Sequence, residues 1–248
     1  MSAPVPRLAA TVLLIRDRSG LEVLMVERNE QAYFASALVF PGGIVEADDS
    51  NEGWLDQTDG HAGLTTAERA LRIAAYRELF EETGVLLTGP QVADTERVAA
   101  PENAAFRDLV KGKGARLDLA AMHPFAHWIT PESSPKRYDT HFRLCGLDTD
   151  LTAVSDGLET VSVEWLRPKD ALDLGRAGER KLLFPTRLNL EMLNASASVD
   201  DAIAAVGKRE IVTVTPRMER RPEGMFLTVP IDAGYGGAEE FVSPPRPG

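Results

Sequence analysis

One stretch of sequence decides the expected fold and site: Arg77-Glu78-Leu79-Phe80-Glu81-Glu82-Thr83-Gly84-Val85. Its three glutamates have the spacing i, i+3, i+4, so a helix would project all of them from one face. Three carboxylates on adjacent turns repel one another, and a hard divalent cation such as Mg²⁺ or Mn²⁺ would relieve that repulsion. Arg77, four positions before Glu81, could hold a carboxylate by a planar, two-pronged contact. A solvated acidic helix face is the alternative that the glutamates alone allow.

The flanking sequence predicts that this stretch ends a long helix over residues 66–83. Thr65 or Thr66 can cap its start, and Gly84 supplies the stop. Upstream, residues 9–15 and 21–27 are apolar and β-branched and predict a β-hairpin. Strands flanked by helices on both sides imply an α/β/α layered fold. Further strands are expected at 37–40, 126–130, 138–147 and 160–166, and further helices at 99–119 (a short pair), 168–174, 182–193 and 200–206.

The stretch resembles the second half of the Nudix box. That box runs glycine, five residues, glutamate, seven residues, then Arg-Glu-apolar-any-Glu-Glu-any-Gly-apolar, and residues 77–85 match every fixed position of its second half. Phe40-Pro41-Gly42-Gly43 is similar to the family's strand-to-loop entry, where a glycine carbonyl approaches the metal. Glycine suits that place because the backbone must come close to a ligand. The resemblance implies a Nudix α/β/α sandwich with a mixed central sheet and added C-terminal helices.

The box is interrupted in this chain. Gly43 precedes Arg77 by 34 positions rather than the 14 of the family pattern, so about 20 residues are inserted. We expect the insertion within residues 47–63, which are polar and glycine-rich. The Nudix domain is expected to span residues 1–215, with helical additions at about 168–206. Residues 216–248 are expected to form an extended, partly disordered tail.

The insertion leaves one box glutamate unassigned. Eight positions before Arg77, where the family has this glutamate, the chain has Arg69. Glu46 and Glu68 both remain open as its replacement. An interrupted box resembles the coenzyme A diphosphatase-like branch of the family, related to the peroxisomal enzyme. Similar segments in that branch are residues 40–46 followed by Trp54-Leu55, residues 70–87, and residues 127–131 together with 136–142.

The resemblance implies a reaction and a cofactor. The reaction is Mg²⁺- or Mn²⁺-dependent hydrolysis of a diphosphate bond in a nucleoside diphosphate linked to another moiety. Coenzyme A or an acyl-CoA is the leading substrate, and ADP-ribose, NADH or a nucleotide sugar is the alternative. A Nudix-fold sensor that binds a nucleotide without hydrolysing it is a third hypothesis. It is disfavoured because Glu78, Glu81 and Glu82 are all present.

The expected site residues follow from the same resemblance. The catalytic set is Arg77, Glu78, Glu81 and Glu82, and the metal ligands are those three glutamates with the Gly42 carbonyl. Substrate-binding candidates are Arg28, Gly42, Gly43, Arg137 and Arg143, since guanidinium groups suit anionic oxygens. Lys136 is a weaker phosphate-binding candidate, and Glu159 is a candidate downstream acid, with an exposed loop carboxylate as the alternative.

Several other residues allow either a functional role or an ordinary structural one. His123 and His127 have the i, i+4 spacing of a zinc site, but Pro124 breaks the helix that such a site requires. We expect Cys145 to be a small core residue rather than a nucleophile. Trp54 and Tyr33 could stack on a nucleobase, although ordinary packing is the simpler expectation.

Composition narrows the class of partner. The chain has 248 residues and a formal net charge of -11, which argues against nucleic-acid binding, since that requires a basic surface. Its single cysteine cannot form an internal disulfide, which fits a reducing compartment. No apolar run reaches the length of a membrane span. We therefore expect a cytoplasmic protein that binds a small nucleotide, and a homodimer is left open.

Overall fold

The computed structural model describes residues 4–29, 36–88, 92–94, 106–148, 151, 153, 155 and 160–242. Helices in this part are α1 (Thr66–Thr83), α2 (Phe106–Gly112), α3 (Pro168–Arg176), α4 (Phe184–Leu193) and α5 (Val199–Gly207), with 3-10 turns η1 (Asp48–Ser50), η2 (Glu52–Gln57), η3 (Leu119–Ala121) and η4 (Ile231–Ala233). Strands are β1 (Arg7–Asp17), β2 (Leu21–Arg28), β3 (Ala37–Val39), β4 (Gly42–Ile44), β5 (Thr58–Asp59), β6 (Leu86–Thr88), β7 (Val92–Asp94), β8 (Leu117–Asp118), β9 (His123–Ile129), β10 (Tyr138–Leu147), β11 (Thr160–Leu166), β12 (Lys181–Leu182), β13 (Thr213–Val214), β14 (Arg217–Arg221), β15 (Gly224–Thr228) and β16 (Glu239–Val242).

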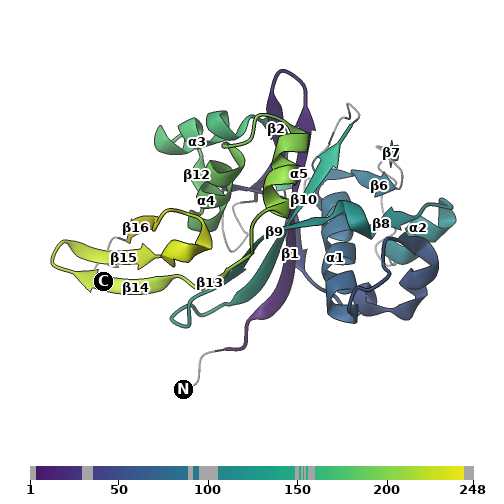
Figure 1. The fold of residues 1–248 in the computed structure, drawn as a ribbon, viewed down its shortest axis with the longest axis horizontal. Coiled ribbons are helices and arrows are strands. Elements are labelled where there is room, and N and C mark those ends of the chain that lie inside the picture. The colour runs from purple at the N-terminus through teal and green to yellow at the C-terminus, as the bar shows by residue number, and fades with distance from the viewer. Residues whose placement is uncertain are drawn as a thin grey trace.

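A mixed sheet of nine strands forms the middle layer of the described chain. Its order is β12-β3-β2-β1-β10-β9-β13, with β11 paired to β2 and β4 paired to β1. β1 runs parallel to β10 and antiparallel to β2, so the predicted hairpin is present at the centre of the sheet. Figure 1 shows α1 and α2 on one side of this sheet and α3, α4 and α5 on the other.

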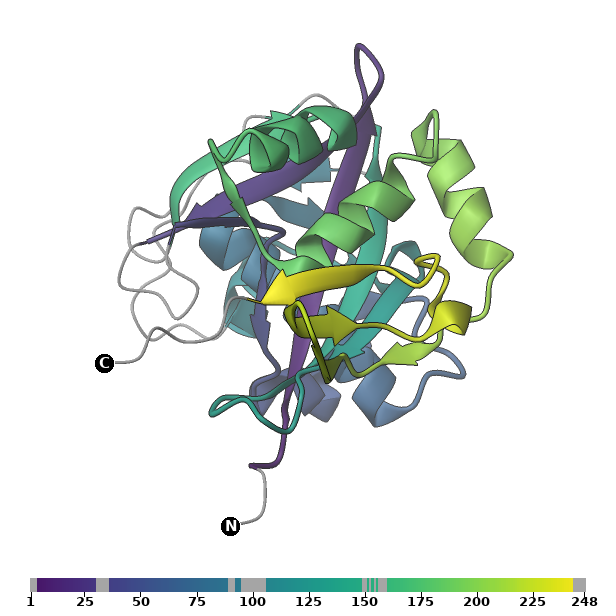
Figure 2. The same ribbon diagram turned by 90° about the vertical axis from the view of Figure 1, so that its left-hand side faces the viewer.

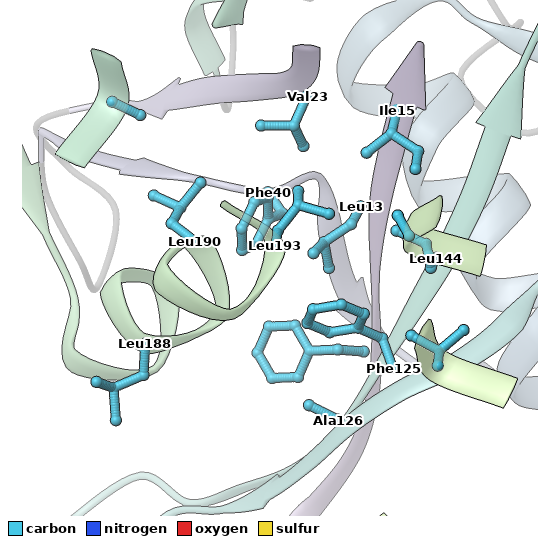
Figure 3. Packing of buried hydrophobic residues seen from close by; sticks show 14 of the residues in the cluster. Leu13, Ile15, Val23, Phe40, Phe125, Ala126, Leu144, Leu188, Leu190 and Leu193 are labelled. Carbon is cyan, nitrogen blue, oxygen red and sulfur yellow. The ribbon is translucent and has the colours of Figure 1, made fainter. Parts of the chain in front are cut away.

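Alternation along the central strands creates two cores. In β1, Leu13 and Ile15 point into the core shared with α3, α4 and α5, whereas Val12 and Leu14 point into the core shared with α1. This is the period-two pattern of a strand buried on both faces. Figure 3 shows Leu13 among the side chains of the first core, near residues of α4. The expected α/β/α sandwich with a mixed central sheet and added C-terminal helices is confirmed.

The helix α1 has the boundaries that the sequence predicts. The side chain of Thr65 accepts a hydrogen bond from the Glu68 backbone N–H, and Gly84 ends the helix with φ of 69° in the left-handed region. Leu71, Ala74 and Leu79 on this helix are buried in the second core. The helix is therefore fixed at both ends and along one face, which gives its glutamates a defined position.

The inserted stretch is better packed than a surface loop. It forms η1, η2 and β5, and Trp54 in η2 is only 2% exposed. The Trp54 ring lies 5.7 Å from the Phe106 ring of α2, and its Nε1 donates to the Asp48 carbonyl at 2.9 Å. Leu55, which follows Trp54 in the sequence, is 37% exposed. Trp54 therefore attaches the insertion to the α1 side of the sandwich, and β5 adds a short parallel pairing with β8.

The C-terminal segment corrects one expectation. Instead of a partly disordered tail, residues 217–242 contain a three-stranded antiparallel sheet in the order β14-β15-β16. Figure 2 shows this sheet, in yellow, crossing in front of the central strands beside α4. The expected second helix of the 99–119 pair is also wrong in part, since β8 and η3 follow α2, while residues 99–105 lie outside the described residues. No helix in the described part of the chain combines the length and the apolar character needed to span a bilayer.

Candidate active site

A cavity of about 940 Å³ lies between the sheet, helix α1 and the C-terminal elements α4 and β15. On the sheet it is lined by residues of β1, β4, β9 and β10. Four glutamates line one end of it: Glu46, Glu78, Glu81 and Glu82. Three of them come from α1, and Glu46 follows β4, which pairs with β1. The glutamates that the sequence places on one helix face therefore share one cavity, and a fourth carboxylate joins them.

Arg77 links the carboxylates of this end. Its Nε and Nη2 donate to the two oxygens of Asp49 at 3.1 and 3.0 Å, a two-pronged contact. Its Nη1 donates to Glu78 at 2.8 Å and to Glu81 at 2.9 Å. Burial lowers the pKa of Arg77, but bonding to Asp49 and the charges of the two glutamates raise it by more, so the guanidinium stays charged.

Asp49 answers the question of the missing box glutamate. Five residues separate Gly43 from Asp49, as in the first half of the family pattern, and Asp49 forms the buried pair with Arg77. The insertion therefore follows Asp49 rather than beginning at residue 47. Glu68 is not the replacement, because its carboxylate pairs with Arg143. Counting six positions onward from Gly43 would have found Asp49, but an aspartate in place of glutamate concealed it.

Gly42 and Gly43 allow the loop to approach the glutamates. The Gly42 N–H donates to Glu82 Oε2 at 3.1 Å. A Cβ on Gly43 would lie 2.5 Å from the Glu78 carboxylate, so any larger residue would displace that carboxylate. Arg28 Nη2 donates to the Gly42 carbonyl at 3.1 Å and reaches Glu82 Oε1 at 3.4 Å. The loop, the strand arginine and the helix are thereby held together.

Glu81 differs from its neighbours in exposure. Its side chain is 46% exposed, against 11% for Glu78 and 3% for Glu82. Burial in the cavity raises the pKa of Glu81 above its ordinary value, with a smaller contribution from the charge of Glu46, and Arg77 only partly opposes this. Glu81 is therefore the most solvent-accessible of the three α1 glutamates, and its pKa is raised above the ordinary value.

Two expected substrate-binding arginines lie elsewhere. Arg143 is 2% exposed and donates to Glu68 at 3.0 Å. It points to the face of β10 opposite to Phe142, which lines the cavity, so Arg143 does not line this cavity. Arg137 donates to the backbone carbonyls of Thr130 and Pro4 and does not line this cavity either.

Comparison with known proteins decides the family. A family profile described as the NUDT19 Nudix domain matches residues 59–190, which is more than half of the chain. The chain belongs to this Nudix family. The matched range includes α1 and its glutamates and ends within α4.

Individual relatives agree with this assignment. The acyl-coenzyme A diphosphatase NUDT19 of Xenopus laevis is 27% identical in an alignment 208 positions long, which covers 62% of this chain and 55% of that protein. The Homo sapiens protein of the same name is 26% identical in an alignment 235 positions long, which covers 73% of this chain and 63% of that protein. A crystal structure of a Nudix hydrolase from Alicyclobacillus acidocaldarius matches with a TM-score of 0.71 and 26% identity, covering 84% of this chain and 98% of the other. The expected resemblance to the coenzyme A diphosphatase branch is confirmed.

This Nudix chain spans only part of its curated relatives. It covers 55% of the length of the first and 63% of the second. Their names describe what those longer proteins act on. For this chain, the profile match and the structural match establish the family and the fold.

One positively charged residue of the cavity was not among the residues expected from the sequence. Arg7, the first residue of β1, lines the same cavity as Arg28 and Arg77. It lies beside Tyr138, which pairs with it across β1 and β10. No motif marks Arg7, and only the pairing of β1 with β10 brings it to the site. Of the other candidates, Glu159 and Tyr33 lie outside the described residues.

A second polar group lies on the far face of the sheet. His127 Nε2 lies 2.5 Å and His141 Nε2 lies 3.4 Å from Asp139 Oδ1, and the two rings are stacked with centroids 4.0 Å apart. His123 is not part of this group. Burial lowers the pKa of His141 to about 4, with help from the charges of His127 and Arg143. The group could hold a metal ion, but two imidazole nitrogens suit zinc better than Mg²⁺ or Mn²⁺.

Cys145 behaves as a core residue. It is 3% exposed and packs in the core shared with α1. Burial raises the pKa of its thiol to about 12, which disfavours the reactive thiolate. Its position agrees with the expectation of a small core residue.

Proposed function

We propose that this chain is a Mg²⁺- or Mn²⁺-dependent diphosphatase that hydrolyses coenzyme A or an acyl-CoA. The carrying observation is that four glutamates line one end of a large cavity while Arg77 links two of them to the buried Asp49. The names of the relatives from Xenopus laevis and Homo sapiens support this substrate class.

The donor set fits a hard divalent ion. Glu78, Glu81 and Glu82 offer carboxylate oxygens, and Arg28 Nη2 lies within hydrogen-bonding distance of both the Gly42 carbonyl and Glu82. Oxygen donors are the ligands that Mg²⁺ and Mn²⁺ prefer. Glu78, Glu82 and the Gly42 carbonyl would hold the ion, which would supply positive charge to offset the diphosphate and to polarise a P–O bond.

The chain's own residues would do the remaining work. Arg28 and Arg7 line the cavity and would orient the anionic oxygens of the diphosphate. Arg77 would keep the carboxylates in place. Glu81 is our choice of general base, because it is partly exposed and its raised pKa makes it a stronger proton acceptor than an ordinary carboxylate. Glu81 would take the proton of the water that attacks phosphorus, and the phosphoanhydride bond on the opposite side would break.

A metal-dependent assay tests this function. Purified protein is incubated with coenzyme A, acetyl-CoA, ADP-ribose, NADH or nucleoside triphosphates, with Mg²⁺, with Mn²⁺ or with EDTA, and the products are identified by mass spectrometry. We expect coenzyme A compounds to give a nucleoside bisphosphate and a phosphopantetheine, and EDTA to stop the reaction. Faster turnover of ADP-ribose or NADH would identify that compound, rather than a coenzyme A compound, as the substrate. Tight binding of one compound without hydrolysis of any would favour the sensor and contradict the proposal.

A further inference from the structure

The C-terminal sheet contributes to the cavity although it lies outside the matched family domain. The match ends at residue 190, yet Pro216, Leu227 and Glu240 line the same cavity as the glutamates of α1. Together with the first turn of α4, they form the part of the cavity lining that comes from the C-terminal elements. We call this part the C-terminal wall and define it as residues 183–186, Pro216, Leu227 and Glu240.

Several contacts fix this sheet to the body of the protein. The Tyr235 hydroxyl, between β15 and β16, donates to Asn189 Oδ1 of α4 at 2.6 Å. Trp128 Nε1 of β9 donates to the same hydroxyl at 3.1 Å. Asn189 is fully buried, and Arg187 pairs with Glu240 at 3.6 Å. The C-terminal wall is therefore anchored to α4 and β9 by partly buried polar bonds.

The two faces of the sheet differ. Leu227 of β15 pairs across the sheet with Glu240 of β16, so both side chains lie on the face that lines the cavity. Phe226 and Phe241 pair on the other face, where their rings contact each other with centroids 5.3 Å apart. Neighbouring positions on one strand thus have separate roles, and Phe226 provides a matched control for Leu227.

The side chains that line the cavity differ in chemical character. The cations are Arg7, Arg28 and Arg77, and they belong to β1, β2 and α1. The C-terminal wall consists mostly of apolar side chains, and the charge of its one acid, Glu240, is paired with Arg187. An uncharged apolar group at this wall would meet leucine, proline and phenylalanine side chains.

We propose that the C-terminal wall binds the acyl arm of an acyl-CoA and that Leu227 determines the preference for acyl length. The inference rests on the proposed function, since it assumes that the diphosphate lies at the glutamates. The acyl-pantetheine arm then extends along the cavity, and its apolar end packs against Leu227 and the first turn of α4. Each methylene that becomes buried there raises affinity by about fourfold, until the cavity is filled.

Binding and turnover are measured separately over an acyl series. Affinities of free coenzyme A, acetyl-, butanoyl-, octanoyl- and dodecanoyl-CoA are determined by calorimetry with Mg²⁺ in a Glu82→Gln background, where turnover does not interfere. We expect dodecanoyl-CoA to bind at least about tenfold more tightly than acetyl-CoA. Adding Leu227→Trp fills the end of the cavity and should remove this gain, while free coenzyme A changes by less than about twofold. Adding Phe226→Trp, on the same strand but facing away, should leave the whole series unchanged.

Each other outcome has a defined meaning. The same length preference in the Leu227→Trp protein would overturn the proposal. So would an equal loss of all ligands, free coenzyme A included, in a Leu227→Trp protein that circular dichroism shows to be folded, and so would no binding of any coenzyme A compound. If the length preference is present but the wild-type protein hydrolyses none of the series, the proposed diphosphatase function is rejected and the acyl-binding role of the C-terminal wall is kept. If the series is hydrolysed without any length preference in binding, the acyl-binding role of the C-terminal wall is rejected and the proposed diphosphatase function is kept.

Discussion

The two ends of the cavity are built in different ways. The acidic end takes three of its four glutamates from five consecutive positions of α1, and one arginine ties two of them to a loop. The apolar end, which is the C-terminal wall, takes Phe184 and Leu227 from α4 and β15, two elements that are far apart in the sequence. A short motif can therefore encode the reaction, whereas the fit of the substrate depends on how distant segments pack. Changes at the acidic end should alter turnover, and changes at the apolar end should alter binding.

The largest effect is expected from Glu82→Gln at the acidic end. This change removes one negative charge from the most buried of the three α1 glutamates while preserving its size. We expect turnover of every substrate to fall by about a thousandfold or more, because a charged group at the reacting centre is lost. Steady-state kinetics with Mg²⁺ measure this, and Glu52→Gln, an exposed glutamate of η2, is the control. Unchanged turnover would reject the metal-site assignment.

The ion pair behind the acidic end gives the next largest effect. Asp49→Ala leaves the buried guanidinium of Arg77 without its two-pronged partner, and we expect the free energy of unfolding to fall by about 3 kcal/mol. The adjacent Asp48 forms a partly exposed pair with Arg107, so Asp48→Ala should cost less than about 1 kcal/mol. Urea denaturation measures both. Equal losses would show that Asp49 has no special role.

The two loop glycines separate activity from stability. A Cβ on Gly43 would meet only the Glu78 carboxylate, and we expect Gly43→Ala to lower turnover by about 10- to 100-fold with little loss of stability. A Cβ on Gly42 would lie 2.5 Å from the Ala10 carbonyl oxygen, which is backbone, so Gly42→Ala should cost about 1–3 kcal/mol of stability. Kinetics and thermal unfolding of both variants test the contrast. The reverse pattern would contradict the assigned positions.

The smallest effect lies outside both ends of the cavity. The pKa of His141 is about 4 in the fold and 6.5 ordinarily. As pH falls from about 6.5 to about 4, the unfolded chain binds this proton first, so the fold loses stability, whereas above 6.5 the residue contributes no pH dependence. With partial exposure considered, we expect a loss on the order of 2 kcal/mol. His141→Gln should remove that part of the pH dependence in urea titrations. An identical pH profile in the variant would contradict the buried neutral state.

The sequence predicts much of the scaffold because local signals determine it. Helix α1 begins after Thr65 and ends at Gly84 as its capping residues indicate, and strands β10 and β11 have the expected bounds. The position of Arg143 was harder to predict, because the register of β10 with its neighbours decides which face each side chain takes.

The C-terminal sheet was missed for a physical reason. Its strands carry exposed charges and few buried apolar residues, as a disordered tail would. What orders them is long-range: Tyr235 reaches Asn189 on α4, and Val229 and Ala233 join the core beneath. A local pattern contains no information about a partner that lies 46 residues away.

The central claim, that the acidic end directs water to a diphosphate, is tested most directly with oxygen-18 water. Octanoyl-CoA and Mg²⁺ are incubated with the wild-type protein in labelled water, and the products are separated and weighed by mass spectrometry. We predict that one labelled oxygen appears in a phosphate group of one product and that the thioester stays intact. Label in free octanoic acid, with the diphosphate uncleaved, would contradict the account.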